Sequence, residues 1–288
     1  MRVVSLVPAG TALLRALGVE PVGVTHSCPN PHGVPVVTES LIPKGLPQEK
    51  IDQRVREARR EGFPLYRIRE EVLASLRPDV LVTQGVCEVC AVGPGEVASA
   101  RTLLPLTPQV VELKGVCLDG LYSDIRALAR AVGQEDRGAL LVQQVETRLG
   151  LLPPPPPRRP TVAFLEWLEP PYLGGHWVPD MVALAGGRYL GPAPGEPSRR
   201  VEAQELPDAQ VVFLAFCGHG LGEAWEALDA HLRRGGPLAP YLRSRRVYVL
   251  EAAFFQALTH LVAEGTWLLA RALRGEEIPP ALARRLEG

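Results

Sequence analysis

The fold is decided by one stretch, Val80-Leu81-Val82-Thr83-Gln84-Gly85-Val86-Cys87-Glu88-Val89-Cys90-Ala91, in which a polar turn and two thiols follow an apolar run. The run comes directly after Arg77-Pro78-Asp79, where Pro78 ends the preceding helix because it disfavours helix for the residue before it. Val80–Val82 therefore predicts a buried strand. In open α/β sheets, ligands bind outside the carboxyl ends of strands, so the turn is the first place to expect a site.

The residues around this stretch alternate between strand and helix patterns. Four apolar runs predict strands, at Val3–Val7, Pro21–Thr25, Val34–Val37 and Val110–Leu113. Helices are predicted at Thr11–Leu17, Ile51–Arg60, Glu70–Leu76 and Val97–Leu103. Such alternation is typical of a parallel sheet, so residues 1–115 are expected to form one α/β lobe.

A helical connector and a second lobe are expected next. Two helices, Tyr122–Val132 and Arg137–Leu149, follow one another without a strand between them, and the run Pro153–Pro157 forms a stiff polyproline segment. The alternation then restarts, with strands at Thr161–Leu165, Ala209–Phe216 and Arg246–Leu250 and helices at Val178–Ala185, Glu223–Arg233 and Leu261–Leu273. The sequence thus predicts an α/β fold with lobes at 1–115 and 153–288 and a connector at 116–152.

Composition favours a small-molecule partner. The formal net charge of -1 over 288 residues gives no electrostatic reason to expect nucleic acid or an anionic membrane. No window reaches the roughly 20 apolar residues of a membrane helix, and the N-terminus has no signal-sequence pattern. The sequence as written predicts a cytoplasmic protein, or a periplasmic one from which a leader has been removed.

The cysteines leave several interpretations open. Five is an odd number, so the chain cannot pair all of them internally. The spacing of Cys87 and Cys90 lets both sulfurs reach one metal ion or each other. A zinc site needs four ligands, and the others would have to come from distant residues such as His26, Cys28, His176, Cys217 and His219. Plain packing, metal binding and a reversible disulfide all remain interpretations, whereas Gly93-Pro94-Gly95 argues against a thioredoxin-like helix start.

Aromatic side chains gather in the segment Glu166–Trp177, which is expected to be a loop after a strand. Aromatic rings on a loop suit a large planar ligand, although Trp167 and Trp177 could equally pack against the protein's own core. Phe254 and Phe255 at another strand end slightly favour a ligand face. The segment Cys217-Gly218-His219-Gly220 lacks the lysine and glycine spacing of a phosphate loop, and no nucleophile elbow is present, so no enzyme is predicted.

Several stretches together resemble a known family. They are Arg2–Pro8 with the following helix, Gly23-Val24-Thr25-His26-Ser27-Cys28, Leu76–Asp79 leading into Thr83–Val92, and Gly174-Gly175-His176-Trp177-Val178-Pro179. The similarity runs over nearly the whole chain and is to cobalamin-binding proteins of the iron-complex and cobalamin type of ABC-transporter substrate-binding proteins. The chain departs from this pattern after Phe255, where Gln256–Leu261 replaces an Asn-Arg-Pro-Gly-Pro-Arg segment.

The resemblance implies a non-enzymatic monomer with one backbone helix, Arg137–Leu149, joining two Rossmann-like parallel-sheet lobes, and a corrinoid such as cobalamin in the cleft between them. It implies an ABC permease as partner, or else a role as an intracellular corrinoid carrier. The implied ligand contacts are Pro8, His26, Cys28, Gln84, Val86, Cys87, Glu166, Trp167, Tyr172, His176, Trp177, Cys217, His219 and Phe255. Alternatives are heme or an iron-siderophore as ligand, and a zinc or redox-sensing protein that uses Cys28, Cys87, Cys90 and a histidine, either His26 or His176.

Overall fold

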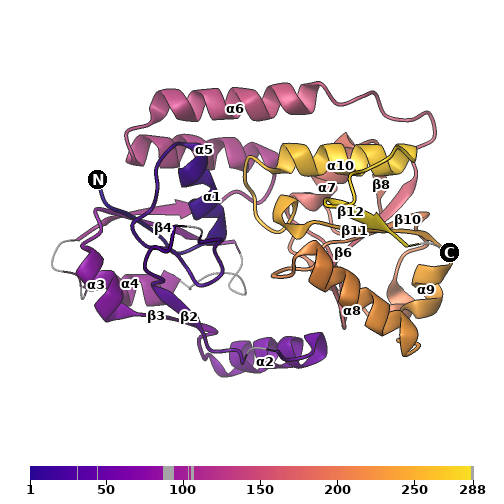
Figure 1. Ribbon diagram of the computed structural model, residues 1–288, viewed down its shortest axis with the longest axis horizontal. Coiled ribbons are helices and arrows are strands. Elements are labelled where there is room, and N and C mark those ends of the chain that lie inside the picture. Colours follow the sequence, from indigo (N-terminus) through magenta and orange to yellow (C-terminus); the bar gives the residue numbers. More distant parts are fainter. Residues whose placement is uncertain (31, 44, 87–93, 103, 105–106, 287–288) are drawn as a thin grey trace. The chain divides into compact units, whose positions relative to one another are not determined.

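The computed structural model describes residues 1–30, 32–43, 45–86, 94–102, 104 and 107–286 (Figure 1). The chain divides into two compact units. The first unit comprises Met1–Gly115 with Asp119–Gln144, and the second comprises Val116–Leu118 with Val145–Gly288. Helix α6, Glu135–Gly150, begins in the first unit and ends in the second, which confirms the predicted backbone helix.

The sheet of the first unit has the strand order β1-β4-β5, with every strand parallel. Its strands are β1 (Val3–Ser5), β4 (Val80–Gln84) and β5 (Gln109–Leu113). On one face Val4 and Leu81 pack with side chains of α3 (Glu70–Leu76) and α4 (Pro94–Thr102). The predicted strand at Val80–Val82 is confirmed and extends to Gln84.

On the other face of this sheet lies α1, Pro8–Ala16. A Cβ atom at Gly10 would stand 2.7 Å from Val82 Cγ1 and 2.8 Å from Ser5 Oγ. Only glycine therefore allows α1 to approach β1 and β4 this closely, and the close approach fixes Pro8 at the carboxyl end of β1.

Two predicted strands of the first unit do not form. The segments at Pro21–Thr25 and Val34–Val37 make only isolated bridges, Val4 with Gly23 and Val24 with Val36. The prolines at both segments lack an amide hydrogen and so interrupt a ladder. The neighbouring residues instead form an antiparallel pair, β2 (Thr38–Ser40) with β3 (Tyr66–Ile68), and α2 (Gln48–Glu61) lies between these two strands in the chain.

The sheet of the second unit has the order β12-β11-β10-β6-β7-β9, and β8 also pairs with β6. Its centre is parallel, formed by β6 (Thr161–Leu168), β10 (Val211–Leu214) and β11 (Arg246–Leu250). Two neighbours, β7 (Pro171–Leu173) and β12 (Ala283–Arg285), run antiparallel to β6 and β11. Short strands β8 (Arg188–Tyr189) and β9 (Arg199–Arg200) complete it. The predicted α/β class is confirmed, while these antiparallel strands were not predicted.

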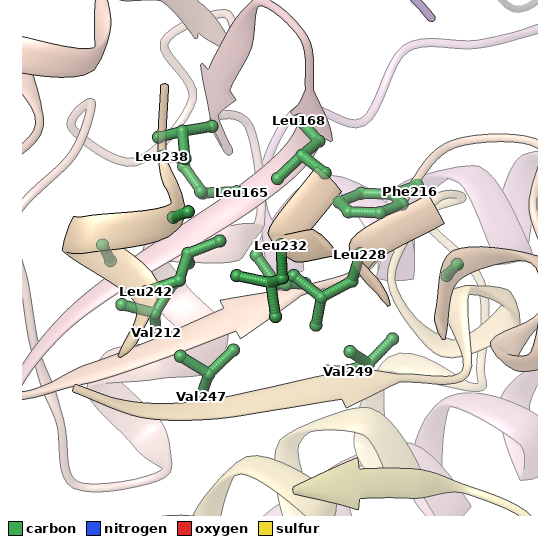
Figure 2. Packing of buried hydrophobic residues seen from close by; sticks show 14 of the residues in the cluster. Leu165, Leu168, Val212, Phe216, Leu228, Leu232, Leu238, Leu242, Val247 and Val249 are labelled. Atoms are coloured by element: carbon green, nitrogen blue, oxygen red, sulfur yellow. The ribbon is translucent and has the colours of Figure 1, made fainter. Parts of the chain in front are cut away.

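Helices cover both faces of this sheet (Figure 1). Residues alternate along the strands, so Leu165, Val212 and Val247 point to one face, where they pack against α8 (Leu221–Arg233) and α9 (Ala239–Arg243), as Figure 2 shows. The other face meets α7 (Val178–Leu184) and α10 (Val262–Arg274), where the Tyr248 hydroxyl donates to the Ala272 carbonyl over 3.3 Å. Within the described ranges, the helices are all too short or too polar to cross a bilayer.

Candidate functional site

In the first unit, three of the candidate residues lie at the carboxyl ends of strands. Pro8 opens α1 directly after β1, while Gln84 ends β4 and Val86 follows it. Because β1 and β4 are parallel, these residues belong to the same edge of the sheet. All three side chains are partly buried, which leaves some of their surface accessible to a ligand.

His26 is exposed and is held in place by two residues that sequence reasoning did not single out. The Thr38 hydroxyl lies 2.8 Å from His26 Nδ1 and accepts the His26 backbone N–H over 3.0 Å. The Tyr66 ring lies 5.1 Å from the imidazole, centroid to centroid. Both partners come from the β2–β3 pair, which the sequence did not predict. The imidazole orientation is therefore set by this two-stranded sheet.

Three of the five cysteines lie among the described residues. Cys28 is a free thiol 2.9 Å from the Thr11 hydroxyl, and burial raises its pKa, so the protonated form dominates at neutral pH. Cys117 and Cys217 are free thiols as well. Cys87 and Cys90 lie outside the described residues. Among the residues that are described, no three His, Cys, Asp or Glu side chains are grouped to hold a metal ion.

In the second unit, the segment expected to be a loop, Glu166–Trp177, begins as a hairpin. Strand β6 continues to Leu168 and pairs antiparallel with β7, so that Trp167 stands opposite Tyr172. The expectation of a loop is wrong here, because the continuation of β6 gives these residues a ladder partner. Trp167 and Tyr172 are both partly buried at the carboxyl end of β6, and Trp167 also packs against the core of the second unit.

A second aromatic contact joins the ends of β6 and β10. The His219 ring meets Trp167 edge-on, with centroids 5.5 Å apart. His219 Nδ1 lies 3.1 Å from the Cys217 carbonyl oxygen, which can only accept, so this nitrogen carries a proton. The Cys217 backbone N–H donates to the Glu166 carbonyl over 3.3 Å. Four candidate residues are thus brought together: Glu166, Trp167, Cys217 and His219.

Glu166 is hydrogen-bonded to a residue that no sequence motif singles out. Ser198 Oγ donates to Glu166 Oε2 over 2.5 Å and accepts the Gly175 N–H over 3.1 Å. Burial raises the pKa of Glu166 to about 7, and the serine hydrogen bond only partly offsets this. The carboxyl group therefore changes its charge close to neutral pH.

His176 and Trp177 are fixed by backbone contacts. His176 has a φ of 53°, and its N–H donates to the Glu196 carbonyl over 2.6 Å. Its buried Nδ1 finds no partner among the described residues, and burial lowers its pKa. The Trp177 indole N–H donates to the Phe255 carbonyl over 2.8 Å. The Phe255 ring itself is 2% exposed and packs on Phe164, so this residue contributes its carbonyl to the segment while its ring lies in the core.

Gln256, one residue further, is exposed, and its side-chain carbonyl accepts the Gly218 N–H over 2.8 Å. This contact links the segment after β11 to the segment after β10. Gln256 lies where the chain departs from the pattern it resembles, and it was not among the residues selected from the sequence.

The comparisons with known proteins agree with this architecture. Residues 3–206 match the family described as periplasmic binding protein. Similar solved structures include the heme-binding protein RhuT from Roseiflexus sp. RS-1 in apo form, at 21% identity and a TM-score of 0.65, with 95% of this chain and 98% of that chain covered.

Two further structures are similar. A periplasmic heme-binding protein from Pseudomonas aeruginosa has 19% identity and a TM-score of 0.69, with 100% of this chain and 98% of that chain covered. The periplasmic vitamin B12-binding protein BtuF of Vibrio cholerae has 17% identity and a TM-score of 0.60, with 95% and 96% covered. At such identities these likenesses show the fold alone, and no curated protein matches. The family match covers most of the sequence, and the chain belongs to the periplasmic binding protein family.

Proposed function

We propose that the protein is the substrate-binding component of an ABC-type uptake system and that it binds cobalamin or a related corrinoid. Its task is to hold the ligand and hand it to a membrane permease, without chemistry on the ligand. The family name also favours the periplasm over the cytoplasm as the compartment in which it acts.

The observation that carries the proposal is the aromatic surface at the carboxyl ends of β6 and β10, formed by Trp167, Tyr172 and His219. A corrin ring offers a broad, largely apolar face for such side chains, and its peripheral amides need hydrogen-bonding partners. Gln84 and Gln256 supply side-chain amides at strand ends of their respective units. The similarity to a vitamin B12-binding protein supports the same ligand class.

Heme is the second candidate, because similar structures from Roseiflexus and Pseudomonas are named as heme-binding proteins. Heme carries propionate carboxylates, which require cationic or donor partners, whereas a corrinoid presents neutral amides. The second-unit candidates include a carboxyl group, Glu166, which would repel a propionate and so favours neutral amides. Arg200, which stands opposite Tyr172, is the cation that a propionate would use.

Calorimetric titration with cyanocobalamin, cobinamide and hemin tests the proposal, with the absorbance of each ligand as an independent readout. We expect one equivalent of a corrinoid to bind with a dissociation constant of about 1 µM or tighter, and hemin to bind more weakly. Tight binding of hemin alone would replace the corrinoid by heme. Absence of binding by all three at roughly 50 µM would refute the proposed ligand class.

A further inference from the structure

The turn Gly174–Trp177 rests on a chain of hydrogen bonds that begins at the Glu166 carboxyl group. Glu166 Oε2 accepts the Ser198 hydroxyl, and Ser198 Oγ in turn accepts the Gly175 N–H. A Cβ atom at Gly174 would stand only 3.2 Å from Glu166 Oε1, so the backbone of the turn lies directly over the carboxyl group. One serine side chain therefore connects a titratable group to the turn.

Other contacts hold the same turn from different elements. The Tyr189 hydroxyl, on β8, donates to the Gly174 carbonyl over 2.5 Å. The backbone of Glu196 accepts the His176 N–H, and the His176 carbonyl accepts the Gly195 N–H over 2.9 Å. Because these contacts involve no ionised side chain, the Ser198–Glu166 link is the part of the anchor that a proton can alter.

Among the described residues, no cation forms a salt bridge with the Glu166 carboxylate, which accepts its hydrogen bond from the Ser198 hydroxyl. Tyr189 and Arg199 act in the same region: burial raises the pKa of the Tyr189 hydroxyl, the Glu166 charge raises it further, and the Arg199 charge opposes this. The remaining titratable neighbours are His176 on the turn, Glu196 below it and Cys217, whose N–H donates to the Glu166 backbone.

We propose that Glu166 is a proton-controlled positioning residue whose ionised carboxylate holds Ser198 against Gly175 and thereby fixes the turn that carries His176 and Trp177. A hydroxyl donates a shorter and roughly twofold stronger hydrogen bond to a carboxylate than to a neutral acid. Protonation therefore weakens the link and loosens the turn. The consequence for ligand affinity, which falls as Glu166 takes up its proton, rests on the proposed function.

The test follows the Trp177 indole N–H by NMR in the ligand-free protein, from about pH 5 to 9, because this group reports on the turn through its bond to the Phe255 carbonyl. We expect its resonance to titrate with a midpoint near neutral pH. Glu166→Gln should abolish the titration. A wild-type signal that does not titrate, or one that titrates alike in Glu166→Gln, would overturn the inference.

Three further variants separate the causes. Ser198→Ala should leave the turn loose at every pH, with faster exchange of the Trp177 indole proton and no neutral midpoint. His176→Asn keeps a residue that tolerates a positive φ and should retain the neutral midpoint, because burial places the His176 titration below that of an ordinary histidine. Glu264→Gln, the matched change at the exposed Arg148–Glu264 pair, should also retain it. Loss of the midpoint in either of these two controls would overturn the assignment to Glu166.

A ligand arm distinguishes this inference from the proposed function. Affinity for cyanocobalamin is measured at about pH 6 and pH 8 in the wild type and in Glu166→Gln. We expect binding several-fold weaker at the lower pH in the wild type and a smaller difference in the variant. A titrating Trp177 signal with no corrinoid binding would support the inference and refute the proposed function. Equal pH dependence in both proteins would overturn the link between Glu166 and affinity.

Discussion

Glu166 carries a carboxyl group whose ionisation the surrounding protein opposes, which makes folding stability depend on pH. Its folded pKa of about 7 lies above the ordinary value of 4.5. The unfolded chain therefore releases this proton first, so the contribution is fully present below pH 4.5 and is lost as the pH rises through 7. Chemical denaturation at several pH values across this range should show the free energy of unfolding of Glu166→Gln rising relative to that of the wild type as the pH increases, by up to about 3 kcal/mol. A constant difference would contradict the account.

His231 shows the opposite pH dependence. It is fully buried, and its Nε2 accepts the Leu238 N–H over 3.1 Å, so the proton sits on Nδ1, which donates to Glu169. Burial lowers the pKa of this imidazole, so its contribution to stability is complete above the ordinary histidine pKa of 6.5 and is lost as the pH falls through the lower folded value. The free energy of unfolding, measured at a series of decreasing pH values, should show this loss.

Removal of the His231 side chain checks the same assignment at alkaline pH. His231→Ala should destabilise the protein by about 2 to 4 kcal/mol, because the Leu238 N–H and Glu169 lose a partner and a cavity remains. The exposed His32 is the matched control, and His32→Ala should change the free energy of unfolding by less than about 0.5 kcal/mol. Similar effects of both substitutions would refute the role given to His231.

Among the elements, the contact between α5 (Leu118–Ala131) and α6 depends on a glycine. A Cβ atom at Gly138 would stand 2.4 Å from Ala129 Cβ, whereas one at Gly150, also in α6, would meet nothing within 4 Å. Gly138→Ala should therefore lower the free energy of unfolding by about 1 to 3 kcal/mol through overpacking, despite the better helix propensity of alanine. Gly150→Ala should be neutral or stabilising by less than about 1 kcal/mol. Thermal unfolding of the two variants, compared with the wild type, tests both expectations.

The central elements were predictable because their patterns are local. Strands β4 and β11 and helices α3 and α6 are short apolar or periodic segments bounded by Pro, Gly or charged residues, and the structure places them within a few residues of expectation. The short strands β7, β9 and β12 were missed because they are two or three residues long and exist only through their neighbours. The β2–β3 pair was missed for the same reason, and so were the contacts that Thr38 and Tyr66 make with His26.

At the scale of the whole molecule, the family was predictable and the detailed site only in part. Trp167 and His219 were selected for their chemistry at strand ends, and the structure brings them together. Ser198 and Tyr189 were not selected, because a serine and a tyrosine between unrelated segments carry no periodic or motif signal. Their roles depend on contacts between residues that are distant in the sequence, and such contacts leave no local pattern.

The aromatic surface gives the binding prediction. Trp167→Ala should weaken the binding of a corrinoid by about 1 to 3 kcal/mol, because the lost ring removes both buried area and stacking. Trp225 supplies the control, because it packs against the same core as Trp167 but from α8, with Arg284 Cζ 5.8 Å from its ring centroid. Trp225→Phe should leave affinity unchanged in the same calorimetric titration. Equal losses in both variants would indicate a general effect on folding.

The most direct test of the central claim is an experimental structure of the protein with cyanocobalamin bound. We predict that the corrin face lies against Trp167 at the carboxyl ends of β6 and β10, with peripheral amides near the side-chain amide of Gln256. A corrinoid bound to another surface, or crystals that remain free of ligand after soaking at about 1 mM, would contradict the account.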